Sequence, residues 1–203
     1  GSLAFASSDE RFEVDDSQLA LKGDHNKLNI LAAMLAVSAV GVDLKTSFSH
    51  VGSFKPLPHR LEFVGRFNGI DFYNDSISTV PESTIAAVKT LKAVSTLILG
   101  GYDRGIDYTE LVNFLNDSTI ENFLFLGKAG DMMMQLFNKS DSAKKLLKMV
   151  HIEDAVAYAK AHTANGICLL SPAAASYDQF HNFEHRGDTF KSCVVKNGPK
   201  KSG

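Results

Sequence analysis

The sequence lacks several features that would point to particular protein classes. It contains no tryptophan and only two cysteines in 203 residues, and both Cys168 and Cys193 lie inside apolar runs typical of buried free thiols. Two cysteines are too few for a disulfide framework or a structural zinc site. The longest apolar stretch, residues 28–42, falls short of the ~20 residues of a membrane-spanning helix. The net charge of −2 gives no basic surface for nucleic acid or an anionic membrane, so neither is an expected partner.

Complete catalytic motifs are missing as well. The sequence has no Gly-x-x-x-x-Gly-Lys-Ser/Thr phosphate loop, no Gly-x-Gly-x-x-Gly fingerprint, no His-Glu-x-x-His motif and no esterase-type nucleophile elbow. No secretory signal is recognisable at the N-terminus, and residues 1–2 resemble an expression remnant. We therefore predict a cytoplasmic protein, with no catalytic residue and no metal ligand assigned within this chain.

The sequence has the composition of a globular α/β protein, with 44% hydrophobic and 22% charged residues. Short apolar runs alternate with helical patterns along its second part, which predicts a Rossmann-like, mostly parallel sheet with helices on both faces. Two prolines in residues 53–58 predict a stiff linker. It separates an N-terminal segment, residues 3–52, from a domain spanning residues 59–195, and residues 196–203 are predicted to be a flexible tail.

Local patterns predict most of the individual elements. A helix from about Lys27 to Gly41 is expected to carry an apolar stripe that includes Leu28, Leu35 and Val42. Asn68-Gly69 predicts a hairpin turn between two strands, and a helix is expected to begin at Pro81. The other predicted strands are 96–99, 122–126, 150–152 and 166–170, and the other predicted helices are 108–115, 129–137, 154–162 and 189–196.

Three segments that directly follow predicted strands carry the residues of most chemical interest. In parallel sheets ligands bind beyond the carboxyl ends of the strands. Residues 74–79 are mostly polar, residues 100–105 combine glycines with Arg104, and residues 171–176 are a run of small residues. Each segment also has an interpretation without a ligand. The first is then an Asx-turn helix cap, the second a glycine turn with a surface arginine, and the third space for a packed helix.

Several short motifs, taken in order, resemble the C-terminal part of the Mur ligases. They are Asp24-His25-Asn26-Lys27-Leu28-Asn29, Leu57-Pro58-His59-Arg60-Leu61-Glu62, Tyr73-Asn74-Asp75-Ser76, Gly100-Gly101, the run from Leu170 to Phe180, Asn182-Phe183-Glu184 and Arg186-Gly187-Asp188. The resemblance implies that residues 3–52 are the tail of a central ATP-binding domain. It implies that residues 59–195 form the domain that binds the incoming amino acid, and that the remaining N-terminal and central domains are missing partners.

The resemblance also implies an activity for the longer protein. Such a ligase adds D-glutamate to UDP-N-acetylmuramoyl-L-alanine in peptidoglycan precursor synthesis. ATP activates the substrate carboxylate as an acyl phosphate, Mg²⁺ bridges phosphate oxygens, and the glutamate amine attacks. Because half of the ATP site lies outside this chain, the isolated chain is expected to be inactive.

The matching positions suggest two sets of binding residues. For ATP they are Asn29 at the adenine, Arg60 at the phosphates and Asp75 at the ribose. For glutamate they are Thr79, Arg104, Ser176, Tyr177 and Phe183, with Tyr177 contributing mainly backbone. Two positions depart from the family pattern, since Ile77 and Arg104 stand where lysines are usual.

Other functions fit the same sequence. The chain is alternatively part of a ligase that adds another amino acid, such as a different Mur ligase or a folylpolyglutamate-type enzyme. A second alternative is a non-catalytic α/β binding module. A third is that residues 3–50 serve as an interaction arm, whose helix packs its apolar stripe against another copy or against the C-terminal domain.

Overall fold

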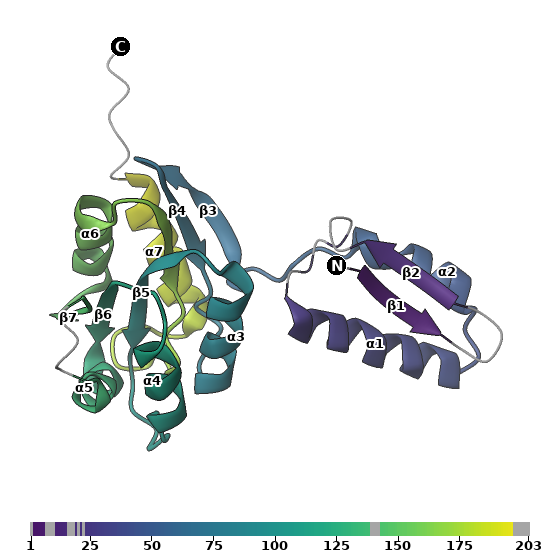
Figure 1. The fold of residues 1–203 in the computed structure, drawn as a ribbon, viewed down its shortest axis with the longest axis horizontal. Helices are drawn as coiled ribbons and strands as arrows, with labels where there is room; N and C mark the ends of the chain where they lie inside the picture. Colours follow the sequence, from purple (N-terminus) through teal and green to yellow (C-terminus); the bar gives the residue numbers. More distant parts are fainter. Residues whose placement is uncertain are drawn as a thin grey trace, which may run out of the picture. The chain divides into compact units, whose positions relative to one another are not determined.

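A computed structural model of the chain describes residues 2–6, 11–15, 19, 21, 23–138 and 143–196. The chain forms two compact units, Gly1–Leu57 and Pro58–Gly203 (Figure 1). The boundary falls inside the segment 53–58 for which a linker was predicted. Ser2 belongs to the first strand, so only Gly1 of the predicted expression remnant lies outside the described residues. Helix α7 includes Lys196, and the rest of the predicted tail, residues 197–203, lies outside them.

The first unit pairs a two-stranded antiparallel sheet with two helices. Its elements are β1 (Ser2–Ala6), β2 (Arg11–Asp15), α1 (Asp24–Ala39), α2 (Leu44–Ser49) and a 3₁₀ turn at Val51–Ser53. Among the described residues of this unit, Leu19, Ile30 and Met34 are the buried apolar ones. Helix α2, which no sequence pattern had predicted, begins where Asp43 accepts a hydrogen bond from the Thr46 amide at 2.7 Å.

Helix α1 buries a different face from its predicted apolar stripe. Leu28, Leu35 and Val42 of that stripe are 67%, 62% and 46% exposed. Ile30 and Met34 face the core instead. The helix carries apolar residues on nearly every side, so its periodicity does not select a face. Packing against the rest of the unit makes the selection.

The second unit is built on one six-stranded sheet in the order β3-β4-β8-β5-β6-β7. Its strands are β3 (Glu62–Phe67), β4 (Ile70–Asn74), β5 (Val94–Gly100), β6 (Asn122–Leu126), β7 (Lys145–Met149) and β8 (Gly166–Leu170). All neighbouring pairs are parallel except β3 with β4. The predicted α/β class with a mostly parallel sheet is confirmed.

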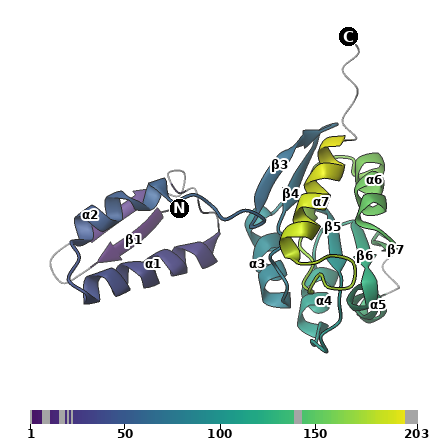
Figure 2. The ribbon, with the colours of Figure 1, turned by 180° about the vertical axis from the view of Figure 1, so that it is seen from behind.

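Helices cover both faces of this sheet (Figures 1 and 2). They are α3 (Pro81–Leu91), α4 (Thr109–Asn116), α5 (Gly127–Leu136), α6 (Ile152–His162) and α7 (Phe183–Lys196). Leu97 and Leu99 of β5 pack on one face with residues of α3, α4 and α5. Ile98 packs on the other face with residues of α6 and α7. This alternation explains why the central strands are continuous apolar runs.

Local signals account for several boundaries. Asn68 and Gly69 both adopt positive φ angles, 53° and 82°, as a two-residue hairpin turn requires. Pro81 occupies the first helical position of α3, where its missing N–H costs nothing.

Cys168 is buried and Cys193 partly buried, and both are free thiols. Among the described helices, none is long and apolar enough to cross a membrane.

Two element predictions in this unit are corrected by the structure. The strand predicted at residues 150–152 is wrong, because the strand is β7 and Ile152 already begins α6. Strand β7 lies at the sheet edge and carries two lysines, so its apolar run is interrupted. Helix α7 begins at Phe183, six residues before the predicted start at 189.

Candidate functional site

The three predicted ligand-binding segments meet because their strands are neighbours. Strand β8 lies between β4 and β5, and the three strands are parallel. The helix that follows β8 packs on the opposite face from the helices that follow β4 and β5. A reversal of this kind opens a crevice beyond the carboxyl ends of the strands. The topology therefore creates a binding position between the three loops.

Glycines bring two of these loops into contact. Gly101 has a φ of 138°, and a Cβ there would collide with the carbonyl oxygen of Ala175. The next amide, that of Tyr102, donates a hydrogen bond to the same oxygen at 2.8 Å. The loop after β5 can therefore lie directly on the loop after β8, which only glycine permits.

A pocket of about 240 Å³ lies at the meeting point. Its lining residues are Ile77, Thr79, Arg104, Ala175, Ser176, Tyr177 and Phe183. The structure thus brings together all five residues that the resemblance assigned to an amino-acid site, although their role stays a prediction. Ala175 was not singled out, and the run of small residues around it was the available signal.

The pocket combines one cation with hydroxyl groups and an apolar wall. Arg104 is the single charged side chain among the lining residues, and its Nη2 donates to the carbonyl oxygen of Thr79 at 2.9 Å. Thr79 and Ser176 supply hydroxyl groups, whereas Ile77 and Phe183 supply apolar surface. A guanidinium suits a carboxylate, and the apolar wall suits short methylenes. The chemistry therefore fits a small carboxylate ligand.

Two of the three predicted nucleotide residues belong to this second unit. Arg60 lies between two residues with positive φ, His59 at 60° and Leu61 at 46°. Its Nη1 donates to Ser78 Oγ at 3.3 Å. The Leu61 amide donates to Asp75 Oδ1 at 3.2 Å, so the segment carrying Arg60 is fastened to the loop after β4.

Asp75 is buried and already hydrogen-bonded within the unit. It is 1% exposed, and its Oδ2 accepts from Ser171 Oγ at 2.8 Å. Burial raises its pKa above the ordinary value, and hydrogen bonds from Ser78 and Ser171 oppose that rise. The predicted contact of Asp75 with a ribose stays a prediction.

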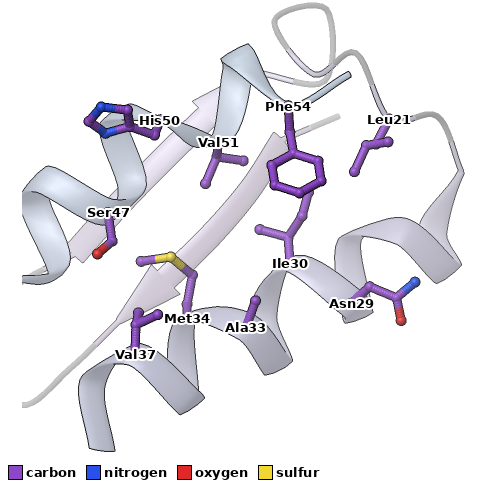
Figure 3. A pocket seen from close by; sticks show the side chains of 10 residues that line it. All are labelled: Leu21, Asn29, Ile30, Ala33, Met34, Val37, Ser47, His50, Val51 and Phe54. Atoms are coloured by element: carbon purple, nitrogen blue, oxygen red, sulfur yellow. The ribbon is translucent and has the colours of Figure 1, made fainter. Parts of the chain in front are cut away.

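Asn29, the third predicted nucleotide residue, lies on α1 in the first unit. It is exposed, and its Nδ2 donates to Asn26 Oδ1 at 3.4 Å. It borders an apolar cavity of about 390 Å³ (Figure 3). Its amide turns away from Ile30, Met34 and Phe54, whose side chains point into the cavity. The amide is therefore presented outward from its own unit.

His59 is a buried residue in a hydrogen-bond network. The ring is 6% exposed, and its Nδ1 lies 2.9 Å from Asn74 Nδ2. Glu62 Oε2 accepts from both the His59 amide, at 2.9 Å, and Asn74 Nδ2, at 3.1 Å. The His59 carbonyl in turn accepts from the Ile77 amide at 3.2 Å. This network joins the start of the unit to the pocket loop.

The side chains that could ligate a metal ion are dispersed. Within the part of the chain that the structure covers, no group of three or more His, Cys, Asp or Glu side chains is arranged to hold an ion. Mg²⁺ is commonly held by one or two carboxylates together with substrate phosphates. These dispersed carboxylates are compatible with an Mg²⁺ ion that binds together with the phosphates of a nucleotide.

Comparison with known proteins gives a consistent picture, although no protein-family model matches the chain. The chain is 39% identical over 188 residues to a UDP-N-acetylmuramoylalanine–D-glutamate ligase of Solibacter usitatus. That match covers 92% of this chain and 42% of the relative. A ligase of the same name from Idiomarina loihiensis is 40% identical over 181 residues, which is 87% of this chain and 38% of the relative. The chain spans about two fifths of the curated relatives that it matches.

Solved structures share the fold at much lower identity. A UDP-N-acetylmuramoylalanyl-D-glutamyl-2,6-diaminopimelate–D-alanyl-D-alanyl ligase from Acinetobacter baumannii matches with a TM-score of 0.72 and 16% identity, over 96% of this chain and 41% of that one. The MurF ligase of Thermotoga maritima, solved in complex with ADP, matches with a TM-score of 0.66 and 20% identity, over 96% and 44%. The curated relatives and the shared fold together establish that the chain belongs to the Mur ligase family.

Proposed function

We propose that this chain is the amino-acid-binding part of an ATP-dependent ligase that adds D-glutamate to UDP-N-acetylmuramoyl-L-alanine. The observation that carries the proposal is the pocket, which gathers Thr79, Arg104, Ser176, Tyr177 and Phe183 around one small volume. The curated relatives are named for joining UDP-N-acetylmuramoylalanine and D-glutamate. The longer enzyme would act in cytoplasmic peptidoglycan precursor synthesis.

The pocket residues would bind and orient the amino acid. Arg104 would take a carboxylate of glutamate, and its existing bond to the Thr79 carbonyl would limit the directions in which its remaining donors point. The Thr79 and Ser176 hydroxyls would donate to carboxylate oxygens. Phe183 and Ile77 would contact the methylenes. Held in this way, the amine gains reactivity by orientation, which is a large part of catalysis in ligases without a protein nucleophile.

The nucleotide site would be shared with chain outside these residues. ATP, when bound with Mg²⁺, supplies the phosphoryl group that activates the acceptor carboxylate as an acyl phosphate. Arg60 fits a role at phosphate because its guanidinium is held by the Ser78 hydroxyl, a neutral partner. Asn29 fits an adenine edge because its amide faces outward from α1. Asp75 would anchor the Arg60 segment through the Leu61 amide.

The isolated chain is proposed to be inactive, because the family's phosphate loop is absent from its sequence. Incubation with ATP, UDP-N-acetylmuramoyl-L-alanine and D-glutamate should release no phosphate above background. Release above that level would contradict this part of the proposal and would favour a complete site within the chain.

An NMR titration of the ¹⁵N-labelled chain tests the pocket directly. D-glutamate, L-glutamate and D-glutamine would be added in parallel, since the amide analogue removes one charge at constant shape. D-glutamate should shift the amides of Thr79, Arg104, Ser176 and Phe183 with millimolar affinity, about −4 kcal/mol. Arg104→Gln should weaken that binding by about tenfold or more, because a charge-assisted hydrogen bond is lost.

The control is Arg66→Gln, which changes an exposed arginine paired with Asp71 on the β3–β4 hairpin. It should leave the glutamate affinity unchanged. A response of residues remote from the pocket would contradict glutamate recognition by Arg104, and equal binding of D-glutamine would mean that the pocket does not recognise the side-chain carboxylate. Preference for another amino acid would favour a ligase of different specificity.

A further inference from the structure

Arg186 is a buried cation that the proposed reaction does not use. It lies in the first turn of α7 and is 2% exposed. Within the described residues, no carboxylate lies within ion-pair distance of its guanidinium. Burial lowers its pKa to about 10, and the charge of Asp178 only partly opposes this. A cation at a helix N-terminus is also opposed by the helix dipole. Burying this charge is unfavourable, so other interactions of Arg186 within the fold must compensate for it.

Its hydrogen bonds supply that reason, because they all reach main-chain or hydroxyl oxygens of two pocket loops. Nε donates to Ser76 Oγ at 3.0 Å, and Nη2 donates to the Ser76 carbonyl at 2.8 Å. Nη1 donates to the carbonyls of Ala174 at 3.0 Å and Ala175 at 3.2 Å. One planar group therefore joins the loop after β4 to the loop after β8.

A third pocket segment is fastened to the same point. Ser76 Oγ, which accepts from Arg186, donates its own proton to the Phe183 carbonyl at 2.8 Å. The Ala175 carbonyl also accepts from the Tyr102 amide, so the loop after β5 shares this oxygen. Each contacted residue adjoins a lining residue of the pocket or is one itself.

We propose that Arg186 is a positioning residue, which fixes the separation of the three loops around the amino-acid pocket without contacting the ligand. The effect depends on the planar fork of the guanidinium rather than on its charge. A lysine keeps the charge but reaches as a single point, so it cannot hold Ser76 and the two alanine carbonyls together. The choice of glutamate as the ligand rests on the proposed function, whereas the bracing of the loops does not.

The test compares Arg186→Lys with Arg66→Lys in the ¹⁵N-labelled full chain. Arg66 makes an equivalent two-point contact with Asp71 at the surface, so it controls for the chemical change. In Arg186→Lys, hydrogen-exchange protection of the Tyr102 amide should fall at least about tenfold, and the D-glutamate Kd should rise by a similar factor. The Leu99 amide, inside β5 and before its last residue, should keep its protection. Arg66→Lys should change none of the three.

Ser76→Ala provides a second, milder variant if Arg186→Lys fails to fold. It removes the hydroxyl link to Phe183 and one acceptor of Arg186 but keeps the Ala174 and Ala175 bonds. It should raise the glutamate Kd several-fold without changing the protection of Leu99. A folded Arg186→Lys variant with unchanged protection at Tyr102 would overturn the proposal. If only Ser76→Ala folds, an unchanged glutamate Kd in that variant would overturn it. If the unmodified chain binds no glutamate, the proposed function fails, and the exchange at Tyr102 still decides the role of Arg186.

Discussion

Among the described residues, the two units of the chain differ in how they bury apolar side chains. In the second unit, both faces of the sheet are covered, and residues such as Leu97, Ile98 and Leu99 are fully buried. In the first unit, the described buried apolar residues are Leu19, Ile30 and Met34, and a cavity of about 390 Å³ lies beside Ile30 and Met34. A parallel sheet covered on both faces buries its own apolar surface. Substitutions at matched positions in the two units should therefore differ in their cost.

The largest difference is expected for glycines at positive φ. In the second unit, a Cβ on Gly100, at a φ of 103°, would collide with the Leu126 carbonyl and approach Gly130. In the first unit, Gly41 has a φ of 75°, and a Cβ there would meet no atom within 4 Å. Gly100→Ala should destabilise its unit by about 4 kcal/mol or more, and Gly41→Ala by only about 1 kcal/mol. Urea denaturation followed by amide signals of each unit would measure both, and equal costs would contradict the comparison.

Two buried methionines on helices allow a matched test of core packing. Met133 of α5 is fully buried against the sheet, whereas Met34 of α1 points into the cavity (Figure 3). Met133→Ala should cost about 3 kcal/mol, because it opens a new void. Met34→Ala should cost about 1 kcal/mol, because fewer contacts are lost beside an existing one. The same denaturation experiment applies, and a larger loss for Met34 would show that the first unit is packed as tightly as the second.

Two aspartates should respond to acid in opposite directions. Burial raises the pKa of Asp75, so its contribution to stability is greatest below the ordinary value of 3.8 and is lost as pH rises through the raised pKa. The hydrogen bond from Thr46 lowers the pKa of Asp43, so its contribution is present above 3.8 and is lost as pH falls.

Asparagine variants separate these two effects. Asp75→Asn should stabilise the second unit by about 1 kcal/mol at neutral pH, with the gain disappearing below pH 3.8. Asp43→Asn keeps an oxygen that can cap α2 but loses the carboxylate charge, so it should make the first unit slightly less stable at neutral pH, and this difference should disappear as pH falls below 3.8. Stability of each variant minus that of the unmodified chain, measured against pH, gives the answer. An Asp75→Asn gain that persists in acid would contradict burial of a charge as its cause.

The two units also differed in how far their structure followed from sequence. In the second unit, buried strands are continuous apolar runs and the loops after them are polar or small, so both were recognisable. Strand β7 was missed because edge lysines break its pattern. In the first unit, the apolar stripe of α1 was recognisable but its buried face was not, because Leu28 and Ile30 are equally apolar and only packing distinguishes them.

The residues that line the pocket could be named from the sequence, but the way in which they come together could not. The resemblance named the lining residues, and the insertion of β8 between β4 and β5, which brings them together, depends on strand order rather than on local pattern. The hydrogen bond between Arg186 and Ser76 joins two residues that lie 110 positions apart in the sequence. Local sequence carries no signal for a partner at that distance.

The smallest effect is expected for the exposed leucines of α1. Replacing Leu28 and Leu35 together with glutamine should change the stability of the first unit by no more than about 0.5 kcal/mol, because neither side chain is buried. If this stripe binds another copy, as the interaction-arm hypothesis predicts, light scattering should detect association of the unmodified chain at high concentration and its loss in the variant. Leu136→Gln, at a 48% exposed leucine on α5, is the matched control. An unmodified chain that remains monomeric would reject packing of the stripe against another copy, whereas a large stability loss in the variant would mean that the stripe is already covered.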